Sequence, residues 1–245
     1  MIEALDHVRI VAADPDRAAA AYAALLGRPP EPRPDGGRSR AWFALSNTAL
    51  NIVEAAGAAE AVDGLVFAAH DLAGTRRALE RRGLASETGR TADLDPAATH
   101  GVSIGLVERG EQSPAPAAEG AVEGLDHVVI HTANPERAVA LYGARLGLDF
   151  RLDRANPQWG SRLMFFRCGG AVVEIGATLD APVSDAPDRI TGLAWRVRDP
   201  AAARARIAGA GFDVSEVRVG RKPGTAVFTV RSGVIGAPAL MIGPT

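Results

Sequence analysis

The feature of this chain that most constrains its fold is an internal repeat. Residues 5–27 match residues 125–147 without a gap, and 14 of the 23 aligned positions are identical. A weaker match relates residues 64–83 to residues 192–211, with an aromatic residue, an Asp, an Arg and a closing Gly at equivalent positions. Because self-similarity of this kind indicates repeated structural units, the chain is predicted to contain four modules in the order A, B, A, B.

Each module has the same predicted order of elements. A short apolar stretch rich in β-branched residues, typical of a strand, precedes an Ala- and Arg-rich helix. Asp14 and Asn134 are the expected N-caps of the type A helices, each followed by Pro at the first helical position. The predicted first strands cover 7–12, 65–70, 127–132 and 193–198, and the helices end at Gly27, Gly83, Gly147 and Gly211. Further strands close each module, and those of the third are expected near 149–153, 161–167 and 171–177, with a tight turn at Gly169 and Gly170.

The predicted fold class is therefore α+β, with four βαβββ modules in tandem. The modules are expected to form two pseudo-symmetric open-barrel domains, residues 1–110 and 123–245, with the helices outside and a pocket within. An Ala-, Pro- and Gly-rich linker at 111–122 joins them. A ferredoxin-like repeat is the structural alternative. The barrel is preferred because three strands follow each helix.

Composition and charge exclude several classes of function. A formal net charge of −2 offers no basic surface for nucleic acid or for an anionic membrane. No run of 18 apolar residues could span a bilayer, and the N-terminus lacks the apolar segment of a secretory signal. Cys168 is the single cysteine, so no internal disulfide forms, and it is interpreted as a partly buried thiol. These features predict a cytoplasmic protein.

Several short motifs carry a resemblance to a known family. They are LDHVRI and LDHVVI at the first strands, DPDRA and NPERA at the helix starts, a Tyr-x₄-Gly helix end, and the segments at 51–56 and 172–177. In these motifs and in its repeat the chain resembles the vicinal-oxygen-chelate superfamily, which includes glyoxalases, bleomycin resistance proteins and extradiol dioxygenases. The motifs are specific for the fold and much less so for the reaction, because the superfamily contains both enzymes and non-catalytic drug-binding proteins.

What the resemblance implies is a divalent metal, Zn²⁺, Ni²⁺, Mn²⁺ or Fe²⁺, and no nucleotide cofactor. In the family the metal is held by a His near the start of a module's first strand and a Glu or Gln on its last strand. Alternate residues of a strand share a face, so an imidazole and a carboxylate on neighbouring strands can converge on one ion. Open coordination positions would then accept two adjacent oxygens of a substrate.

The expected ligands are unevenly retained in this sequence. In the third module His127 and Glu174 match the pattern, whereas in the first module His7 matches and Asn51 stands at the carboxylate position. The type B modules have Gly64 and Gly105, then Gly192 and Leu240, at the two positions. If each A module pairs with the B module of its own half, neither half supplies more than two good ligands. A functional metal site usually has at least three.

Three alternatives would complete a metal site. His131 lies on the same strand face as His127 and could join it as a ligand. His70 should face the barrel interior by the same alternation along its own strand. Pairing of the first module with the third would instead assemble His7 and Asn51 with His127 and Glu174. Against these stands a purely structural interpretation, in which each His pairs with the Asp that precedes it or fills space.

Further candidates for substrate binding lie near the third module's hairpin and in the fourth module. Trp159 sits in a loop flanked by Pro and Gly, and Arg162 could bind a carboxylate through two hydrogen bonds. Arg40 takes the matching place in the first module, and a solvated edge charge is the alternative for both arginines. The alternation of side chains along its strand should direct Arg196 toward the barrel interior. An Arg196–Glu174 ion pair there would make the pocket metal-free.

Two hypotheses for function follow. The first is a small-molecule lyase or isomerase that uses a divalent metal in the C-terminal half, held by His127, Glu174 and His131, or that uses Glu174 as a base. The second is a metal-free protein that binds and sequesters a small ligand. An extradiol-type dioxygenase is disfavoured, because Gly192 and Leu240 stand where its ligands belong. The expected partner is a small molecule, and the expected assembly is a monomer or a homodimer.

Overall fold

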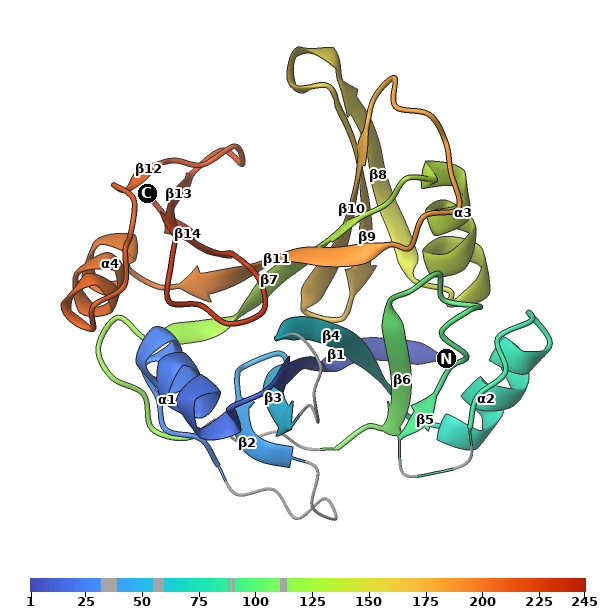
Figure 1. The fold of residues 1–245 in the computed structure, drawn as a ribbon, viewed down its shortest axis with the longest axis horizontal. Coiled ribbons are helices and arrows are strands. Elements are labelled where there is room, and N and C mark those ends of the chain that lie inside the picture. The colour runs from blue at the N-terminus through green and yellow to red at the C-terminus, as the bar shows by residue number, and fades with distance from the viewer. Residues whose placement is uncertain (32–38, 55–59, 88, 90, 111–113) are drawn as a thin grey trace. The chain divides into compact units, whose positions relative to one another are not determined.

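The computed structural model describes residues 1–245 except 32–38, 55–59, 88, 90 and 111–113 (Figure 1). Two predictions extend beyond the described residues: positions 55 and 56 of the motif at 51–56, and positions 111–113 of the linker. The helices among the described residues are α1 (Pro15–Leu26), α2 (Leu72–Glu80), α3 (Pro135–Val139), the π-helix η1 (Ala140–Arg145), the 3₁₀-helix η2 (Pro157–Trp159) and α4 (Pro200–Gly209). None of them is long and apolar enough to cross a membrane.

The described strands fall into two open sheets. The first has the order β2-β3-β1-β4-β6-β5, from β1 (Ile2–Ala12), β2 (Ser39–Ala44), β3 (Ala49–Glu54), β4 (Ala61–Ala69), β5 (Ala92–Asp93) and β6 (Ser103–Glu108). The second has the order β12-β13-β14-β11-β7-β10-β9-β8, from β7 (Val122–His131), β8 (Asp149–Asn156), β9 (Ser161–Cys168), β10 (Ala171–Thr178), β11 (Arg189–Val197), β12 (Arg218–Val219), β13 (Thr225–Val230) and β14 (Ala239–Pro244). The predicted α+β fold with open sheets is confirmed.

The second sheet has the eight strands expected of two βαβββ modules, whereas the first has six within the described residues. In place of the expected second strand of the first module there is a single bridge between Glu31 and Trp42, next to residues 32–38, which lie outside the described part. In the second module a bridge between Ser86 and Leu94 takes the corresponding place. Within the described residues the first half thus follows the repeat with fewer strands.

The chain forms two compact units. One comprises residues 1–7, 64–111 and 127–191, and the other comprises residues 8–63, 112–126 and 192–245. Each sheet takes its strands from one predicted half, but each compact unit combines segments of both halves. The predicted domain boundaries at 1–110 and 123–245 stay a prediction.

The helix ends follow the predicted chemistry. The carboxylate of Asp14 accepts a hydrogen bond from the backbone N–H of Arg17 at 2.9 Å, and the Asn134 amide oxygen accepts one from Arg137 at 3.1 Å. These side chains satisfy N–H groups that a helix start leaves unpaired. The four glycines predicted at the helix ends, 27, 83, 147 and 211, all have φ between 71° and 90°, the left-handed region that only Gly enters without strain.

An arginine in each compact unit caps a helix of another module. Arg206 of α4 donates to the carbonyls of Ala24 and Leu25, the latter at 2.8 Å, at the end of α1. In the other unit Arg145 of η1 donates to the carbonyls of Arg82 and Gly83, just after α2. A guanidinium satisfies unpaired carbonyls and opposes the partial negative charge of a helix C-terminus. Both contacts therefore join a module of the first half to one of the second.

Candidate functional site

The third module brings His127 and Glu174 together on one face of its sheet. Strands β7 and β10 are parallel neighbours, with Val172 paired to His127 and Glu174 paired to Val129. Residues an even number apart on a strand share a face, so both side chains project to the same side. His127 Nε2 lies 3.7 Å from Glu174 Oε2, and the two side chains are 18% and 16% exposed.

The opposite face of this sheet forms the core under α3 and η1. Phe166 and Val173 are paired and buried on that face, and the Phe166 ring lies 6.0 Å from the ring of Tyr142 in η1. We call the side that carries His127 and Glu174 the open face. Its residues are partly exposed where those of the helix-covered face are buried.

Apolar side chains surround the pair on the open face. Phe165 of β9 lies directly opposite Glu174, and Leu152 of β8 lies opposite Phe165. Leu152 is 50% exposed, although it is a large apolar residue. Gly176 follows Glu174 on the same face, and an added Cβ there would find only ordinary van der Waals contacts. The pair thus stands beside apolar side chains, the combination of few polar groups with apolar lining that is typical of small-molecule sites.

The strand registers show which residues occupy the equivalent position in the type B modules. Glu174 pairs with the residue two places after His127. In the second module the corresponding pair is Val66 with Gly105, and in the fourth it is Ala194 with Leu240. The type B modules therefore contribute neither an imidazole nor a carboxylate at the positions where the resemblance would place metal ligands.

Within the described part of the chain, the predicted metal ligands are not grouped with a third protein donor. Among the described residues, no three His, Cys, Asp or Glu side chains are grouped so that they could hold one ion. His131 is exposed and lies four residues beyond His127, which is about 13 Å along a strand at roughly 3.3 Å per residue. This spacing weighs against His131 as a third ligand beside His127 and Glu174, and its role stays a prediction.

The weaker candidates of the first module are engaged in buried polar contacts. His7 Nδ1 lies 2.7 Å from Asp6 Oδ1, and the two residues are 5% and 7% exposed. Asn51 is 6% exposed, and its side-chain oxygen accepts a hydrogen bond from the Ser39 hydroxyl at 2.7 Å. The Asp6–His7 contact agrees with the purely structural interpretation of His7, in which the His pairs with the Asp that precedes it.

Arg162, predicted to bind substrate, lies on the other face of the sheet. It pairs with Ala177 of β10, an odd number of residues from Glu174, so the two side chains point to opposite sides. Its guanidinium makes a two-bond contact with Asp153 at 2.9 and 2.6 Å and a further bond to Glu136 of α3 at 2.6 Å. These bonds raise the pKa of Arg162 and lower that of Asp153. Arg162 therefore belongs to a surface ion-pair network.

The other candidates occupy different places. Arg40 pairs with the exposed carboxylate of Glu54, as expected for an edge charge. Trp159 is 53% exposed at the tip between β8 and β9, and its role over a pocket stays a prediction. The Arg196 side chain lies against Gly124 in the second compact unit, where an added Cβ would be 3.0 Å from Nη2. Its pairing with Glu174 also stays a prediction.

Cys168 and His70 lie in other parts of the fold. Cys168 is 4% exposed, and burial raises the pKa of its thiol to about 12, so little of it is the nucleophilic thiolate near neutral pH. His70 lies where β4 ends, and with Asp71, Arg76 and Glu108 it lines a surface depression of about 390 Å³. Arg76 in that depression is already bonded to the Ser86 hydroxyl at 2.9 Å.

Part of the chain matches the profile of a known protein family. Residues 126–228, which include β7 with His127 and β10 with Glu174, match the profile of the Glyoxalase/Bleomycin resistance protein/Dioxygenase superfamily. The predicted vicinal-oxygen-chelate resemblance is thereby confirmed. No curated protein matches the sequence.

Solved structures extend the likeness in fold to the whole chain. A triple mutant of 4-hydroxymandelate synthase from Streptomyces coelicolor has a TM-score of 0.76 at 13% identity, covering 100% of this chain and 93% of that one. The Mn(II)-bound glyoxalase from Novosphingobium aromaticivorans has a TM-score of 0.73 at 16% identity, covering 99% and 82%. The halotolerant catechol dioxygenase BphC has a TM-score of 0.73 at 12% identity, covering 98% and 87%. At these identities the likeness shows the fold, which all four modules share.

Proposed function

We propose that this protein binds a small molecule on the open face of the second sheet, with His127 and Glu174 as the polar anchor and no resident metal. The observation that carries the proposal is the partly buried His127–Glu174 pair, 3.7 Å apart, beside Phe165 and Leu152. A carboxylate accepts hydrogen bonds and a neutral imidazole both accepts and donates them. The pair is therefore suited to a hydroxyl group on an otherwise apolar ligand.

Two protein donors are fewer than a resident metal usually has, which favours binding without a metal. The described residues place two potential ligands on the open face and group no third with them. The type B modules have Gly105 and Leu240 at the positions that correspond to Glu174. A protein that sequesters a ligand needs only shape and a few polar contacts, whereas a catalytic zinc usually needs three protein ligands.

The test compares two probes that differ by one hydroxyl group, 1-naphthol and naphthalene, in equilibrium dialysis against the full chain. A site that hydrogen-bonds a hydroxyl prefers the probe that has it. We expect the chain to bind 1-naphthol more tightly than naphthalene, and Glu174→Gln to reduce that preference about tenfold. Equal binding of the two probes by the parent and by the variant would contradict the proposal.

A metal-dependent lyase or isomerase is the second candidate, and one distance favours it. Two donors bound to one ion at about 2.0–2.2 Å lie roughly 3.0–3.5 Å apart. The separation of 3.7 Å between His127 Nε2 and Glu174 Oε2 is close to this range. When bound, a divalent ion would supply Lewis-acid polarisation of a ligand oxygen. The Mn(II)-bound glyoxalase among the structural neighbours is consistent with this candidate.

Dialysis against Zn²⁺, Ni²⁺, Mn²⁺ and anaerobic Fe²⁺, followed by elemental mass spectrometry, separates the two candidates. The first proposal expects less than a tenth of an equivalent of metal in the parent and in a His127→Ala/Glu174→Ala double variant. Near-stoichiometric metal in the parent that is lost in the double variant would establish the second candidate instead.

A further inference from the structure

Gly176 is a strand glycine that the packing of the described residues does not require. It lies in β10 on the open face, two residues after Glu174, and it pairs in register with Leu163 of β9 without a β-bulge. Its φ is not in the left-handed region. An added Cβ would lie 3.6 Å from Leu163 Cδ2 and 3.9 Å from the carbonyl oxygen of Ile130, which are ordinary contact distances. A side chain would therefore fit at this position.

Other strand glycines have a reason within the fold. An added Cβ at Gly64 of β4 would lie 2.5 Å from the carbonyl oxygen of Ser103, and one at Gly243 of β14 would lie 2.5 Å from that of Val197. Contacts this short exclude a side chain at both positions. A glycine inside a strand weakens the strand, and it often marks a place where a ligand or another backbone approaches closely. Gly176 lacks the close backbone, which leaves a ligand.

The repeat shows which residues occupy the corresponding position in the other modules. The strand registers place Val107 there in the second module and Ile242 in the fourth. The sequence match places Val53 there in the first module. All three are β-branched, the type of residue that strands favour. Glycine thus replaces a β-branched residue in the module that carries Glu174.

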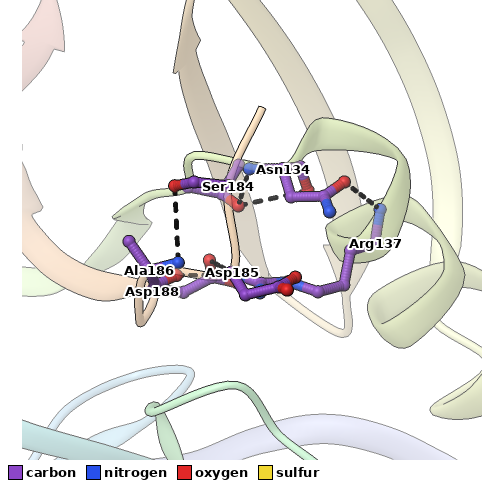
Figure 2. Close-up of polar contacts among 7 residues, drawn as sticks. Asn134, Arg137, Ser184, Asp185, Ala186 and Asp188 are labelled. Carbon is purple, nitrogen blue, oxygen red and sulfur yellow. Dashed lines mark hydrogen bonds and ion pairs between the residues drawn. The ribbon is translucent and has the colours of Figure 1, made fainter. Parts of the chain in front are cut away.

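The segment that follows β10 is fastened on the other side of the module. Arg137 of α3 donates to the carbonyl of Ala186 and to the carboxylate of Asp188, each at 2.8 Å (Figure 2). The backbone N–H of Ser184 donates to the carbonyl of Ala133, just before α3, at 3.3 Å. Because α3 packs on the face opposite the open face, these contacts hold the segment on the helix side of the sheet.

Apolar side chains border Gly176 on its own face. Leu163 is its partner on β9, and Phe165, the partner of Glu174, is the next residue of β9 on that face. Both are partly exposed. Glu174 and Gly176 are two residues apart, which is about 7 Å along a strand at roughly 3.3 Å per residue. An aromatic ring on the backbone at Gly176 can therefore pack against Phe165 and present a hydroxyl group to the Glu174 carboxylate.

We propose that Gly176, Leu163 and Phe165 form a ring subsite. The aromatic ring of the ligand lies on the backbone of β10 at Gly176, and its hydroxyl group reaches Glu174. The ring subsite rests on the proposed function and deepens it, because it names hydroxyaryl compounds as the class of ligand. A β-branched side chain at residue 176, as in the other three modules, would occupy the place of the ring.

Gly176→Val tests the proposal, because valine stands at this position in the first and second modules. We expect Gly176→Val to bind both 1-naphthol and naphthalene about tenfold more weakly than the parent in equilibrium dialysis, as overpacking of moderate size would cause. Gly176→Ala should lie between the two. The urea midpoint of Gly176→Val should not fall below that of the parent, since replacing a glycine restricts the unfolded chain.

Gly209→Ala is the control, at the end of α4. An added Cβ at Gly209 meets no described atom within 4 Å, so this variant also replaces a glycine without crowding its neighbours. It should bind both probes as the parent does. Nuclear Overhauser effects from the ring protons of 1-naphthol to the Hα protons of Gly176 would locate the ring directly.

The two probes separate the ring subsite from the polar anchor. If the parent prefers 1-naphthol and Gly176→Val binds both probes as the parent does, the ring subsite is overturned and the anchor stands. If the parent binds both probes equally and Gly176→Val binds both more weakly, the ring subsite is supported and the anchor fails. Failure of the parent to bind either probe overturns both. A lower urea midpoint for Gly176→Val would contradict the packing on which the ring subsite depends.

Discussion

Glu174 lies directly opposite Phe165 on neighbouring strands of the second sheet, so that a carboxylate stands beside an aromatic ring on the open face. Burial of an apolar ligand against that ring would supply most of the affinity, since apolar contact contributes about 25 cal/mol per Å². We predict that Phe165→Asp weakens the binding of 1-naphthol at least tenfold in equilibrium dialysis. Val219→Asp, at an 80% exposed position on β12, is the control and should bind as the parent does. Equal affinities of all three proteins would place the binding site elsewhere.

Part of this site could be predicted from the sequence. A two-residue turn at Gly169 and Gly170 pairs Cys168 with Ala171, and every later pair of the hairpin follows from it. The same count pairs Arg162 with Ala177, which sets Arg162 on the helix-covered face. The predicted substrate role of Arg162 came from its charge alone, and the turn already indicated the other face. The same count pairs Phe165 with Glu174 and so sets Phe165 on the open face.

Other features of the site and the fold could not be predicted from the local sequence pattern. The strand register of β8 shifts between Phe150 and Leu152, so that Leu152 rather than Arg151 faces the same side as Phe165. A β-bulge of this kind inserts one residue and changes which side chains share a face, and no repeat or periodicity marks it. The combination of segments from both halves in each compact unit likewise rests on contacts between residues far apart in the chain.

Arg162 should matter for acid stability and not for ligand binding. The Arg162 guanidinium holds the pKa of Asp153 below its ordinary value, so the pair contributes stability above the unfolded pKa of about 3.9. That contribution is lost as the pH falls through the lower folded pKa. We predict that Arg162→Gln costs about 1 kcal/mol or less at pH 7, because the pair is partly exposed, and leaves 1-naphthol affinity unchanged.

Urea unfolding of the parent and Arg162→Gln between pH 2 and pH 7 would measure this effect. The difference in stability between the two proteins should shrink toward low pH, where Asp153 is protonated in both. A constant difference across this range would show that the contribution of Arg162 does not depend on the charge of Asp153.

The cap that Arg206 provides for α1 should be worth more than an exposed ion pair. Burial lowers the pKa of Arg206, and its Nη2 donates to the carbonyl of Leu25 at 2.8 Å. We predict that Arg206→Met destabilises the protein by about 2 kcal/mol, because carbonyls at a helix end lose charged donors. Arg198→Met removes an ion pair whose Arg side chain is 88% exposed and should lie within about 0.5 kcal/mol of the parent. Equal losses in the two variants, measured by urea unfolding, would contradict the capping role.

Cys168 should be silent toward thiol reagents in the folded protein. Its thiol has a pKa of about 12 because of burial, so almost none of it is thiolate at pH 8. We predict no reaction with 5,5′-dithiobis(2-nitrobenzoate) over an hour in buffer, and release of one equivalent of chromophore in 6 M guanidinium chloride, since the chain has one cysteine. Rapid reaction of the native protein would show that β9 opens locally.

His100 should make the folded protein less stable as the pH falls below neutral. Burial lowers the pKa of its imidazole, and the charges of Arg137 and Arg145 lower it further, while Asp188 and Asp185 oppose the shift. The unfolded chain binds a proton at this residue near the ordinary pKa of about 6.5, and the folded protein binds it only at lower pH. Stability is therefore lost as the pH falls through about 6.5, and the loss ends below the folded pKa.

His100→Asn isolates this effect from the titration of the other histidines. His100 has a φ of 57°, a conformation that Asn tolerates better than most residues, so at pH 8 we expect the variant to equal the parent or to exceed it by about 0.5 kcal/mol. Between pH 7 and pH 5 the parent should lose more stability than the variant, because only the parent carries this proton-linked penalty. Urea unfolding at several pH values measures both curves. Parallel curves would mean that His100 takes up its proton equally in the folded and unfolded states, which would contradict the effect of burial and of the two arginines.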